Sequence, residues 1–357
     1  GLTESQQLQV VPVYNLSAPA AREALTDIAG ADNALAPDVI QQSALVGRSV
    51  SSRLTQALAR VQVPVGAGSS LTDGTDSPDG VTVNLPMTGI YEYSSWLKYS
   101  KDWGELGSGD ARYHSSGITL GFDKQYAPGS RVGGFLTYNV IGYGATAANQ
   151  QTYDWRLGLY GGWHNGAKDA YAYLDYGWQR NHMQRAIRNT ALRTDTEYTS
   201  RLIEAGGEYK YDLTAGKGKI WHVSPYAGTQ VSYYQQPGYA EAGAGALNQQ
   251  VSSFHNTYAA AEAGVELKRE LVKGSYTLRA GCKRVLAGDD PEMEFHYEGD
   301  AAHSYRNHGC TDRMLLTLGL SGEHEFAPGW KLSGDLGLEK GSHDKEMTAS
   351  VTLRHVW

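Results

Sequence analysis

This chain of 357 residues is poor in cysteine, in basic charge and in long hydrophobic runs. Its two cysteines, Cys282 and Cys310, cannot form a zinc cluster on their own, and neither belongs to a C-x-x-C motif. No stretch approaches the ~18–20 consecutive apolar residues that a spanning helix needs, and the mean hydropathy is −0.45. The sequence therefore excludes a helical membrane protein, and it predicts neither a metal site nor a bound cofactor.

The chain also lacks the electrostatic footprint of a nucleic-acid-binding protein. Its formal net charge is −7 and its pI is near 5.9, whereas nucleic-acid-binding domains carry basic patches. Residues 1–16 contain neither a basic start nor an apolar run, so no signal peptide opens the sequence. We expect a mature product or an excised fragment that has no nucleic-acid partner.

What the chain does contain is glycine and two kinds of aromatic residue. It has 43 Gly, 24 Tyr and 8 Trp, but only 5 Phe. An aromatic content of 10% argues against a disordered chain, because disorder depletes aromatic residues. The length suggests about two ordinary domains, although an all-β barrel forms a longer single unit.

Most of the helix-like sequence lies in residues 18–60, with a break at Gly30. Its second segment, residues 37–60, begins with Pro37, which suits the first turn of a helix. Only isolated apolar residues follow, so this helix has a thin apolar stripe and is a poor partner for an oily core. About 20 helical residues span roughly 30 Å, the thickness of a bilayer core.

Four units follow from this change of character along the chain. We predict a passenger remnant or pre-helix segment at residues 1–36, a helix at 37–60, a linker at 61–87 and a β-barrel at 88–357. The linker contains the run Gly-Ala-Gly-Ser-Ser and the pair Asp-Gly, which are typical of flexible connections.

From about Tyr91 to Trp357, apolar residues recur at every second position. In residues 153–163, one face carries Tyr153, Trp155, Leu157, Leu159 and Trp163, and the other carries Asp154, Arg156, Gly158 and Tyr160. Such alternation marks a sheet whose two faces meet different environments. We count about twelve such strands, beginning near residues 91, 111, 131, 151, 169, 197, 220, 253, 275, 311, 330 and 345. Most of them exceed the ~5–6 residues usual in soluble sheets.

The predicted connections alternate in length. Short turns rich in Gly and Pro lie near residues 127–130, 165–166, 215–218, 273–274 and 328–329, and longer polar loops lie at 101–110, 143–150, 182–196, 236–252 and 288–309. Tryptophans occur near the strand ends, as in the aromatic girdles of outer-membrane barrels. A soluble barrel or β-sandwich is the alternative, but it would need a polar outer face. The pattern favours an all-β fold, a 12-stranded antiparallel transmembrane β-barrel with an N-terminal helical segment inside the lumen.

Several stretches resemble the translocator β-domain of type Va autotransporters, a type V secretion system of Gram-negative bacteria. They are Gly117–Asp123 (GITLGFD), Val132–Tyr138 (VGGFLTY), Trp96–Lys98, Glu204–Gly206, Pro225–Gly228 and Glu262–Leu267. The polar segment 37–60 resembles the family's helix that threads the pore. The likeness extends from about residue 18 to the end of the chain.

The final strand resembles the C-terminal signal by which outer-membrane barrels are recognised for assembly. Its signal residues are Val351, Leu353, His355 and Trp357; His355 departs from the Tyr or other hydrophobic residue that is common there. A strand with a free edge can be captured by strand addition, with alternate side chains giving specificity. The strand also reads simply as the one that closes the barrel.

The resemblance implies a monomer in the bacterial outer membrane that carries its own N-terminal passenger to the cell surface. It implies as partners the outer-membrane lipid, the barrel assembly machinery and periplasmic chaperones. The segment 37–60 would then plug the lumen. We expect its arginines to meet lumen acids; these are Arg48, Arg53 and Arg60 on the helix, and Asp123, Asp154, Asp175, Glu204 and Glu208 on the wall. The alternative is that each of these side chains is solvated in the lumen and forms no specific pair.

Two other functions remain open from the sequence. A porin would need a constriction loop in place of the polar helix, and a barrel enzyme would need a catalytic cluster. We assign no catalytic residue and predict that the chain is not an enzyme. Some family members cut their passenger at an Asn-Asn step, which this sequence lacks; its nearest candidate is Asp32-Asn33, and we expect no self-cleavage.

The loop at 288–309 and its flanks carry the last candidates. His296, His303, His308 and Cys310 cluster there at irregular spacing, which favours a solvated loop over a metal site. If that loop is symmetric about residue 296, Cys282 and Cys310 lie opposite each other on adjacent strands. An oxidising compartment would then favour a disulfide, and we keep this pair as a candidate.

Overall fold

The computed structural model describes residues 11–28, 93–106, 111–217, 220–309 and 311–357. Near the N-terminus, residues 11–14 are helical and are followed by α2 (Ala18–Ile28). In the described part of the chain, no helix has the length and apolar character needed to cross a bilayer. The predicted helix 37–60, the linker 61–87 and the arginines at 48, 53 and 60 lie outside the described residues.

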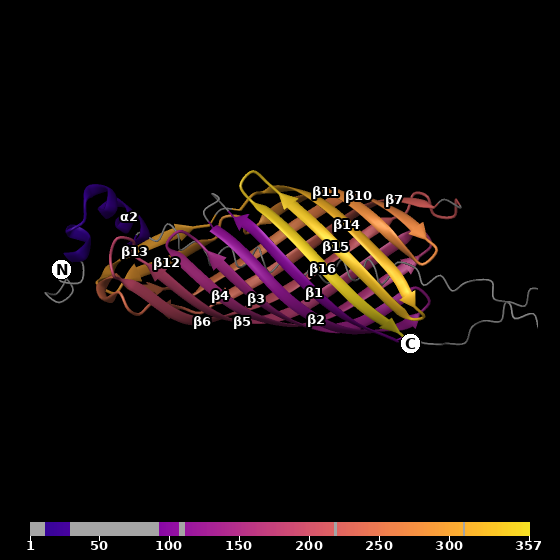
Figure 1. The fold of residues 1–357 in the computed structure, drawn as a ribbon, viewed down its shortest axis with the longest axis horizontal. Helices are drawn as coiled ribbons and strands as arrows, with labels where there is room; N and C mark the ends of the chain where they lie inside the picture. Colours follow the sequence, from indigo (N-terminus) through magenta and orange to yellow (C-terminus); the bar gives the residue numbers. More distant parts are fainter. Residues whose placement is uncertain (1–10, 29–92, 107–110, 218–219, 310) are drawn as a thin grey trace, which may run out of the picture.

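Twelve long strands close into an antiparallel barrel, as predicted. They are β1 (Tyr93–Leu106), β2 (Ala111–Ala127), β3 (Ser130–Gly144), β4 (Ala148–Asn165), β5 (Lys168–Ala186), β6 (Arg193–Tyr211), β7 (Trp221–Gln236), β10 (Phe254–Leu271), β11 (Gly274–Ala287), β14 (Met314–Ala327), β15 (Trp330–Lys340) and β16 (Lys345–Val356). β1 pairs with both β2 and β16, so the last strand closes the barrel against the first. Figure 1 shows these strands inclined to the long axis of the molecule.

The two faces of the barrel wall are inverted relative to a soluble protein. Along β4, Asp154 and Arg156 are fully buried in the interior, whereas Leu157 and Leu159 expose more than half of their side-chain surface outward. The same inversion recurs on every side of the barrel; outward apolar residues include Leu97, Leu120, Leu174, Ile203, Val231, Val265, Leu278, Leu318, Leu336 and Val351. An apolar outer band with a polar interior is the arrangement of an outer-membrane barrel.

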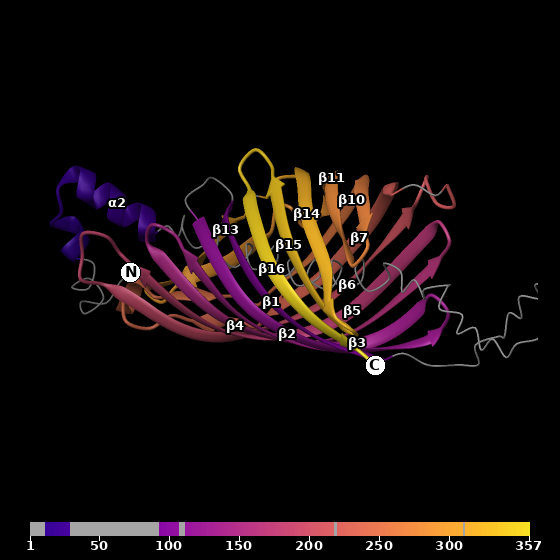
Figure 2. The same ribbon diagram turned by 45° about the vertical axis from the view of Figure 1, so that its right-hand side comes forward.

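A second, smaller sheet lies at the long-loop end of the barrel (Figure 2). It consists of β8 (Tyr239–Ala240), β9 (Gln249–Val251), β12 (Glu292–Tyr297) and β13 (Asp300–His308), with the short helix η1 (Gly245–Leu247) beside it. The prediction of plain loops at 236–252 and 288–309 was therefore wrong. The prediction of a loop at 182–196 was also wrong in part, because β5 continues to Ala186 and β6 begins at Arg193. Apart from the buried Met183, the side chains on both faces of these strand ends are polar or small, so the sequence alternation is weak although the backbone ladder continues to Ala186 and Arg193.

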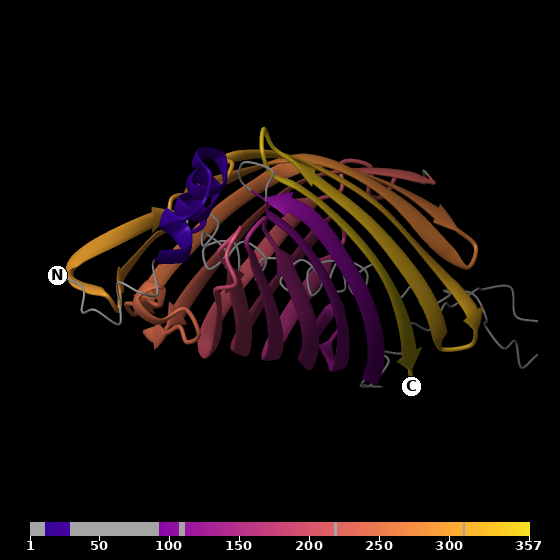
Figure 3. The ribbon, with the colours of Figure 1, turned by 60° about the vertical axis from the view of Figure 1, so that its left-hand side comes forward.

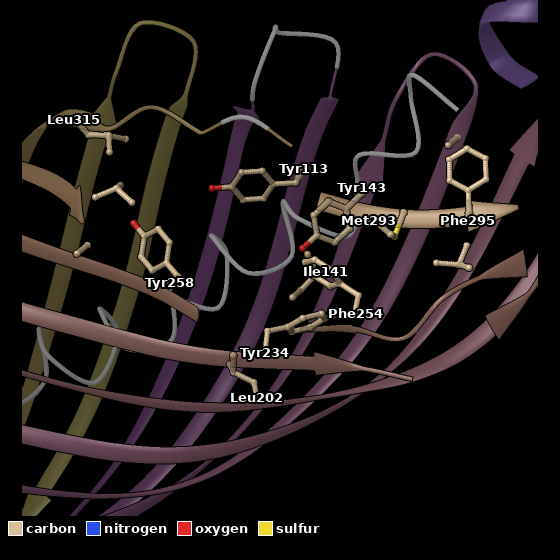
Figure 4. Close-up of a cluster of buried hydrophobic side chains, with 14 of the residues drawn as sticks. Tyr113, Ile141, Tyr143, Leu202, Tyr234, Phe254, Tyr258, Met293, Phe295 and Leu315 are labelled. Carbon is tan, nitrogen blue, oxygen red and sulfur yellow. The ribbon is translucent and has the colours of Figure 1, made fainter. Parts of the chain in front are cut away.

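The main hydrophobic cluster lies inside the wall at this same end. Met293 and Phe295 of β12 are almost completely buried against residues of the barrel strands, among them Tyr143 and Tyr234 (Figure 4). The small sheet thus packs its apolar face against the interior of the barrel mouth. Burial of such side chains stabilises the loops by ~1.5–3 kcal/mol each.

The two ends of the barrel differ in what they hold. At the short-turn end, the backbone of Trp357 exchanges two hydrogen bonds with that of Tyr93, at 2.9 and 3.0 Å. At the other end, α2 lies beside the loops, and Figure 3 shows it next to the orange segments of the small sheet. Ile28 therefore lies at the long-loop end of the barrel, and Tyr93, the next described residue along the chain, lies at the opposite end.

Candidate functional site: the lumen wall and the closing strand

The centre of the lumen wall holds one buried arginine among three carboxylates. The Nε of Arg156 donates to Asp154 at 2.8 Å, and its Nη1 lies 3.6 Å from Asp175 and 3.5 Å from Glu204. The hydroxyl of Tyr173 donates to Glu204 at 2.8 Å. This set carries formal charges of one cation and three anions, and a charge removed from water is costly unless it is paired.

These side chains meet because neighbouring strands are in register. Arg156 stands on β4, Asp175 on β5 and Glu204 on β6, and Asp175 is the direct ladder partner of Glu204. All three point inward by the period-two rule for strands. Both carboxylate oxygens of Asp175 lack a hydrogen-bond donor among the described residues, so this acid is the least satisfied of the set.

A second network lies on the first strands of the barrel. Asp123 is fully buried and accepts from Ser94 at 2.6 Å, from Tyr160 at 2.7 Å and from the guanidinium of Arg131. The indole of Trp96 in turn donates to the Tyr160 hydroxyl at 2.8 Å. This carboxylate is well satisfied by the wall itself, which indicates a structural role that ties β1 to β4.

The opposite wall carries paired charges around an open cavity. Arg279 donates to Glu208 at 2.6 Å, and Lys210 donates to Glu266 at 2.8 Å. A cavity of about 240 Å³ adjoins these pairs, and the charged residues that line it include Glu262, Lys283 and Glu339. This side of the lumen is polar and roomy enough for several water molecules.

Aromatic rings lie against glycines on the inner wall. Phe135 covers Gly158, and Trp96 covers Gly121, so closely that a Cβ at either glycine would overlap the ring. At Gly206 a Cβ would lie 2.6 Å from the ring of Tyr173. Glycine is required here because a neighbouring side chain occupies the space above the backbone. The glycine excess of the sequence has this packing as one of its causes.

The five predicted lumen acids all point inward, but each has a cation from the wall nearby. Arg131 faces Asp123, Arg156 faces three of them and Arg279 faces Glu208. The sequence placed Arg156 on the polar face of its strand, yet it did not show which residues stand across from it. The partners predicted for these acids, Arg48, Arg53 and Arg60, lie outside the described residues, so those pairings stay predictions.

The final strand carries the predicted signal residues at the short-turn end. Val351 and Trp357 are half exposed on the outer side, and Leu353 is the ladder partner of Leu97. The ring of His355 stacks on that of Trp330, with centroids 4.3 Å apart. In this position the imidazole extends an aromatic row, which gives His355 a packing role where a larger hydrophobic residue is common.

The register predicted for the cysteines was wrong. Cys282 is exposed on the outer face of β11, and its ladder partners are Ala263 and Leu316. The connection from β11 to β14 contains the hairpin β12–β13 and is centred near residue 299, since Cys282 pairs with Leu316, and not near residue 296. Position 310 lies outside the described residues, so the disulfide itself stays a prediction.

The histidines of the long connection are spread over the hairpin. His296 stands on β12, while His303 and His308 stand on β13. His303 contacts Asp300 at 2.8 Å, and His308 lies 3.5 Å from Asp290. Within the described ranges, no group of three His, Cys, Asp or Glu residues is arranged to hold a metal ion.

The model of one known protein family matches most of this chain. The Autotransporter beta-domain family matches residues 95–337, which is more than half of the chain. The chain belongs to the autotransporter β-domain family. As a member, it is an outer-membrane translocator domain of a Gram-negative bacterium, a transport domain by fold.

Two solved structures of autotransporters share this fold. The translocator domain of NalP from Neisseria meningitidis aligns with a TM-score of 0.62 and 16% identity, over 76% of this chain and 90% of that one. The β-domain of the Bordetella autotransporter BrkA aligns with a TM-score of 0.54 and 14% identity, over 74% of this chain and 98% of that one. A search of curated proteins finds no match to the sequence.

Proposed function

We propose that this autotransporter β-domain mediates the secretion of its own N-terminal passenger, and that residues 37–60 afterwards occupy the lumen. One observation carries the proposal: the described chain stops at Ile28 beside the long loops and resumes at Tyr93 beside the short turns. In an outer-membrane barrel the long loops face the cell exterior and the short turns face the periplasm. Because lipid surrounds the wall, the lumen is the route for a polar segment that connects the two ends.

The charges of the lumen support this route. The cluster of Asp154, Asp175 and Glu204 has one described cation, Arg156, and thus a formal charge of −2 when all three acids are ionised. An arginine from the segment 37–60 would bring a second cation to it. We propose Arg48, Arg53 and Arg60 for this role.

The partners follow from the same proposal. We propose that β16, with its signal residues from Val351 to Trp357, is the strand that the barrel assembly machinery recognises, after periplasmic chaperones have delivered the chain. Strand addition at a free edge is a general mode of such recognition. We further propose that the domain works as a monomer, without a cofactor and without catalytic residues of its own.

Conductance in planar bilayers tests the plug. We expect the intact chain to show low conductance, and a chain lacking residues 1–60 to show a conductance several-fold higher, because the polar segment no longer fills the lumen. A chain lacking only residues 1–28 is the control, and it should keep the low value. A large open conductance of the intact chain would instead favour a passive porin, and equal conductance of all three would contradict the plug.

A further inference from the structure

The loops at the exterior end bind α2 through a buried carboxylate. Asp27 lies near the last turn of α2, and its side chain is completely buried. The Nε and Nη2 of Arg188 donate to Asp27 Oδ1 at 2.9 and 2.7 Å, and the backbone N–H of Arg188 donates to Oδ2 at 2.7 Å. A forked guanidinium on a carboxylate is among the stronger pairs in proteins, especially when water is excluded.

The last carbonyl groups of α2 also accept hydrogen bonds from the loops. A helix leaves its last carbonyl groups without partners inside the helix. Here Arg185 donates to the carbonyl of Asp27 at 3.3 Å, and Gln249 and the hydroxyl of Tyr297 donate to the carbonyl of Ile28, Gln249 at 3.4 Å. Burial raises the pKa of Tyr297 to about 12, so its hydroxyl remains a donor at physiological pH. Arg185 is itself fixed by a buried pair with Glu241.

Apolar and polar contacts complete the surface beneath α2. Ala24 and Val13 are buried in one cluster with Ile187, Ala244 and Leu247. On the outer side, the amide of Asn189 donates to Glu23 at 2.9 Å and to the carbonyl of Ala20 at 3.3 Å. Asn189 adopts a φ of 61°, a conformation that asparagine tolerates better than most residues, and this conformation turns its connection beneath the helix.

The platform is assembled from three separate connections of the barrel. Arg188 and Asn189 belong to the β5–β6 connection, Gln249 to the β7–β10 connection and Tyr297 to the β11–β14 connection. An isolated helix of 11 residues is marginal in water, so α2 owes its stability mainly to this platform. Contacts of this number and burial indicate a binding surface that matches one particular segment.

We propose that the exterior loops are a receptor for residues 11–28, and that docking of α2 anchors the secreted segment to the barrel independently of the covalent chain. This inference rests on the proposed function, because it takes residues 1–28 to emerge at the cell surface. Docking would then hinder the segment from sliding back into the lumen. A passenger cut from the barrel between Ile28 and the lumen segment would remain attached to the cell.

The test uses the full chain with an epitope tag before Gly1 and a specific protease site inserted after Asp32. After cleavage on intact cells, we expect the tagged fragment of the parent chain to stay with the cells. Asp27→Ala should release at least ten times more fragment into the medium, because the buried carboxylate that accepts from the side chain and backbone of Arg188 is removed. Arg22→Gln is the matched control, since Arg22 lies on the exposed side of α2, and it should retain the fragment.

A charge exchange separates docking from folding. Arg188→Asp should release the fragment, and combining it with Asp27→Arg should restore part of the retention. Each variant must show the heat-modifiable mobility of a folded barrel, which migrates differently in gel electrophoresis before and after boiling. Equal release of the fragment from the parent chain and from Asp27→Ala would overturn the proposal that the exterior loops are a receptor for α2. A tag that never reaches the surface in any variant would overturn the proposed function, and this inference with it.

Discussion

Replacing Arg156 by methionine is expected to destabilise the folded barrel by about 3–5 kcal/mol, the usual cost of removing one partner from a buried ion pair. Arg156 is fully buried and is the described cation that faces Asp154, Asp175 and Glu204. Without it, three carboxylates crowd one region of the wall, where they repel one another and lose the cation that the described wall provides. Urea titration of the barrel in lipid vesicles, followed by tryptophan fluorescence, measures the free energy of unfolding.

An exposed arginine on the neighbouring strand provides the control. Arg180 of β5 donates to Glu197 at 2.8 Å, but its side chain is exposed at 68%. Surface pairs of this kind contribute only ~0–1 kcal/mol, so Arg180→Met should leave the unfolding curve nearly unchanged. Similar losses for Arg156→Met and Arg180→Met would mean that the lumen cluster is hydrated and screened. Arg156→Lys should give an intermediate loss, because it keeps the charge but not the planar fork.

The strands and their faces could be predicted from the sequence, because a barrel in a membrane imposes one strict pattern. Leu157 and Arg156 differ in polarity because one side of β4 meets lipid and the other meets the lumen. Alternation therefore indicated both the strands and their orientation. The register between strands could not be predicted in this way, because alternation is equally satisfied by a shift of two residues.

The lumen cluster shows the consequence. Arg156 and Glu204 are far apart in sequence and meet only because β4, β5 and β6 pair in one register. The wrong register predicted for Cys282 has the same origin, since it placed the centre of the connection near residue 296, whereas the ladder pairs of β11 with β14 and of β12 with β13 place it near residues 299–300.

One strand of the small sheet, β12, has an alternating sequence pattern, but the polar composition of the surrounding loop obscured it. In residues 292–297, Met293, Phe295 and Tyr297 alternate with polar residues, which is the pattern of a strand with one buried face. Its neighbour β9 has only three residues, Gln249–Val251, too few to show any period. The helix α2 was evident in the helix-like composition of residues 18–28, but its docking depends on side chains from three distant connections. Sequence alone does not bring these together.

The glycines of the inner wall allow a second large effect to be predicted, at Gly158. A Cβ on Gly158 would overlap the ring of Phe135 and lie 2.9 Å from the Cβ of Asp175. Phe135 is buried among Trp96, Tyr160 and Tyr173, so its ring has little room to move. Overpacking of a filled interior costs about 1–3 kcal/mol. We expect Gly158→Val to fall at the upper end of this range in the same urea titration.

Gly161, on the same strand, separates crowding from the general effect of adding a side chain. Its Cβ would approach only the carbonyl oxygen of Arg131, at 3.6 Å, which is ordinary van der Waals contact. Gly161→Val should therefore change the free energy of unfolding by less than about 0.5 kcal/mol, or stabilise the strand slightly, since valine favours strands. If Phe135→Ala rescues Gly158→Val, the clash lies between these two side chains. Equal losses at Gly158 and Gly161 would show that backbone flexibility, and not the ring of Phe135, requires glycine in β4.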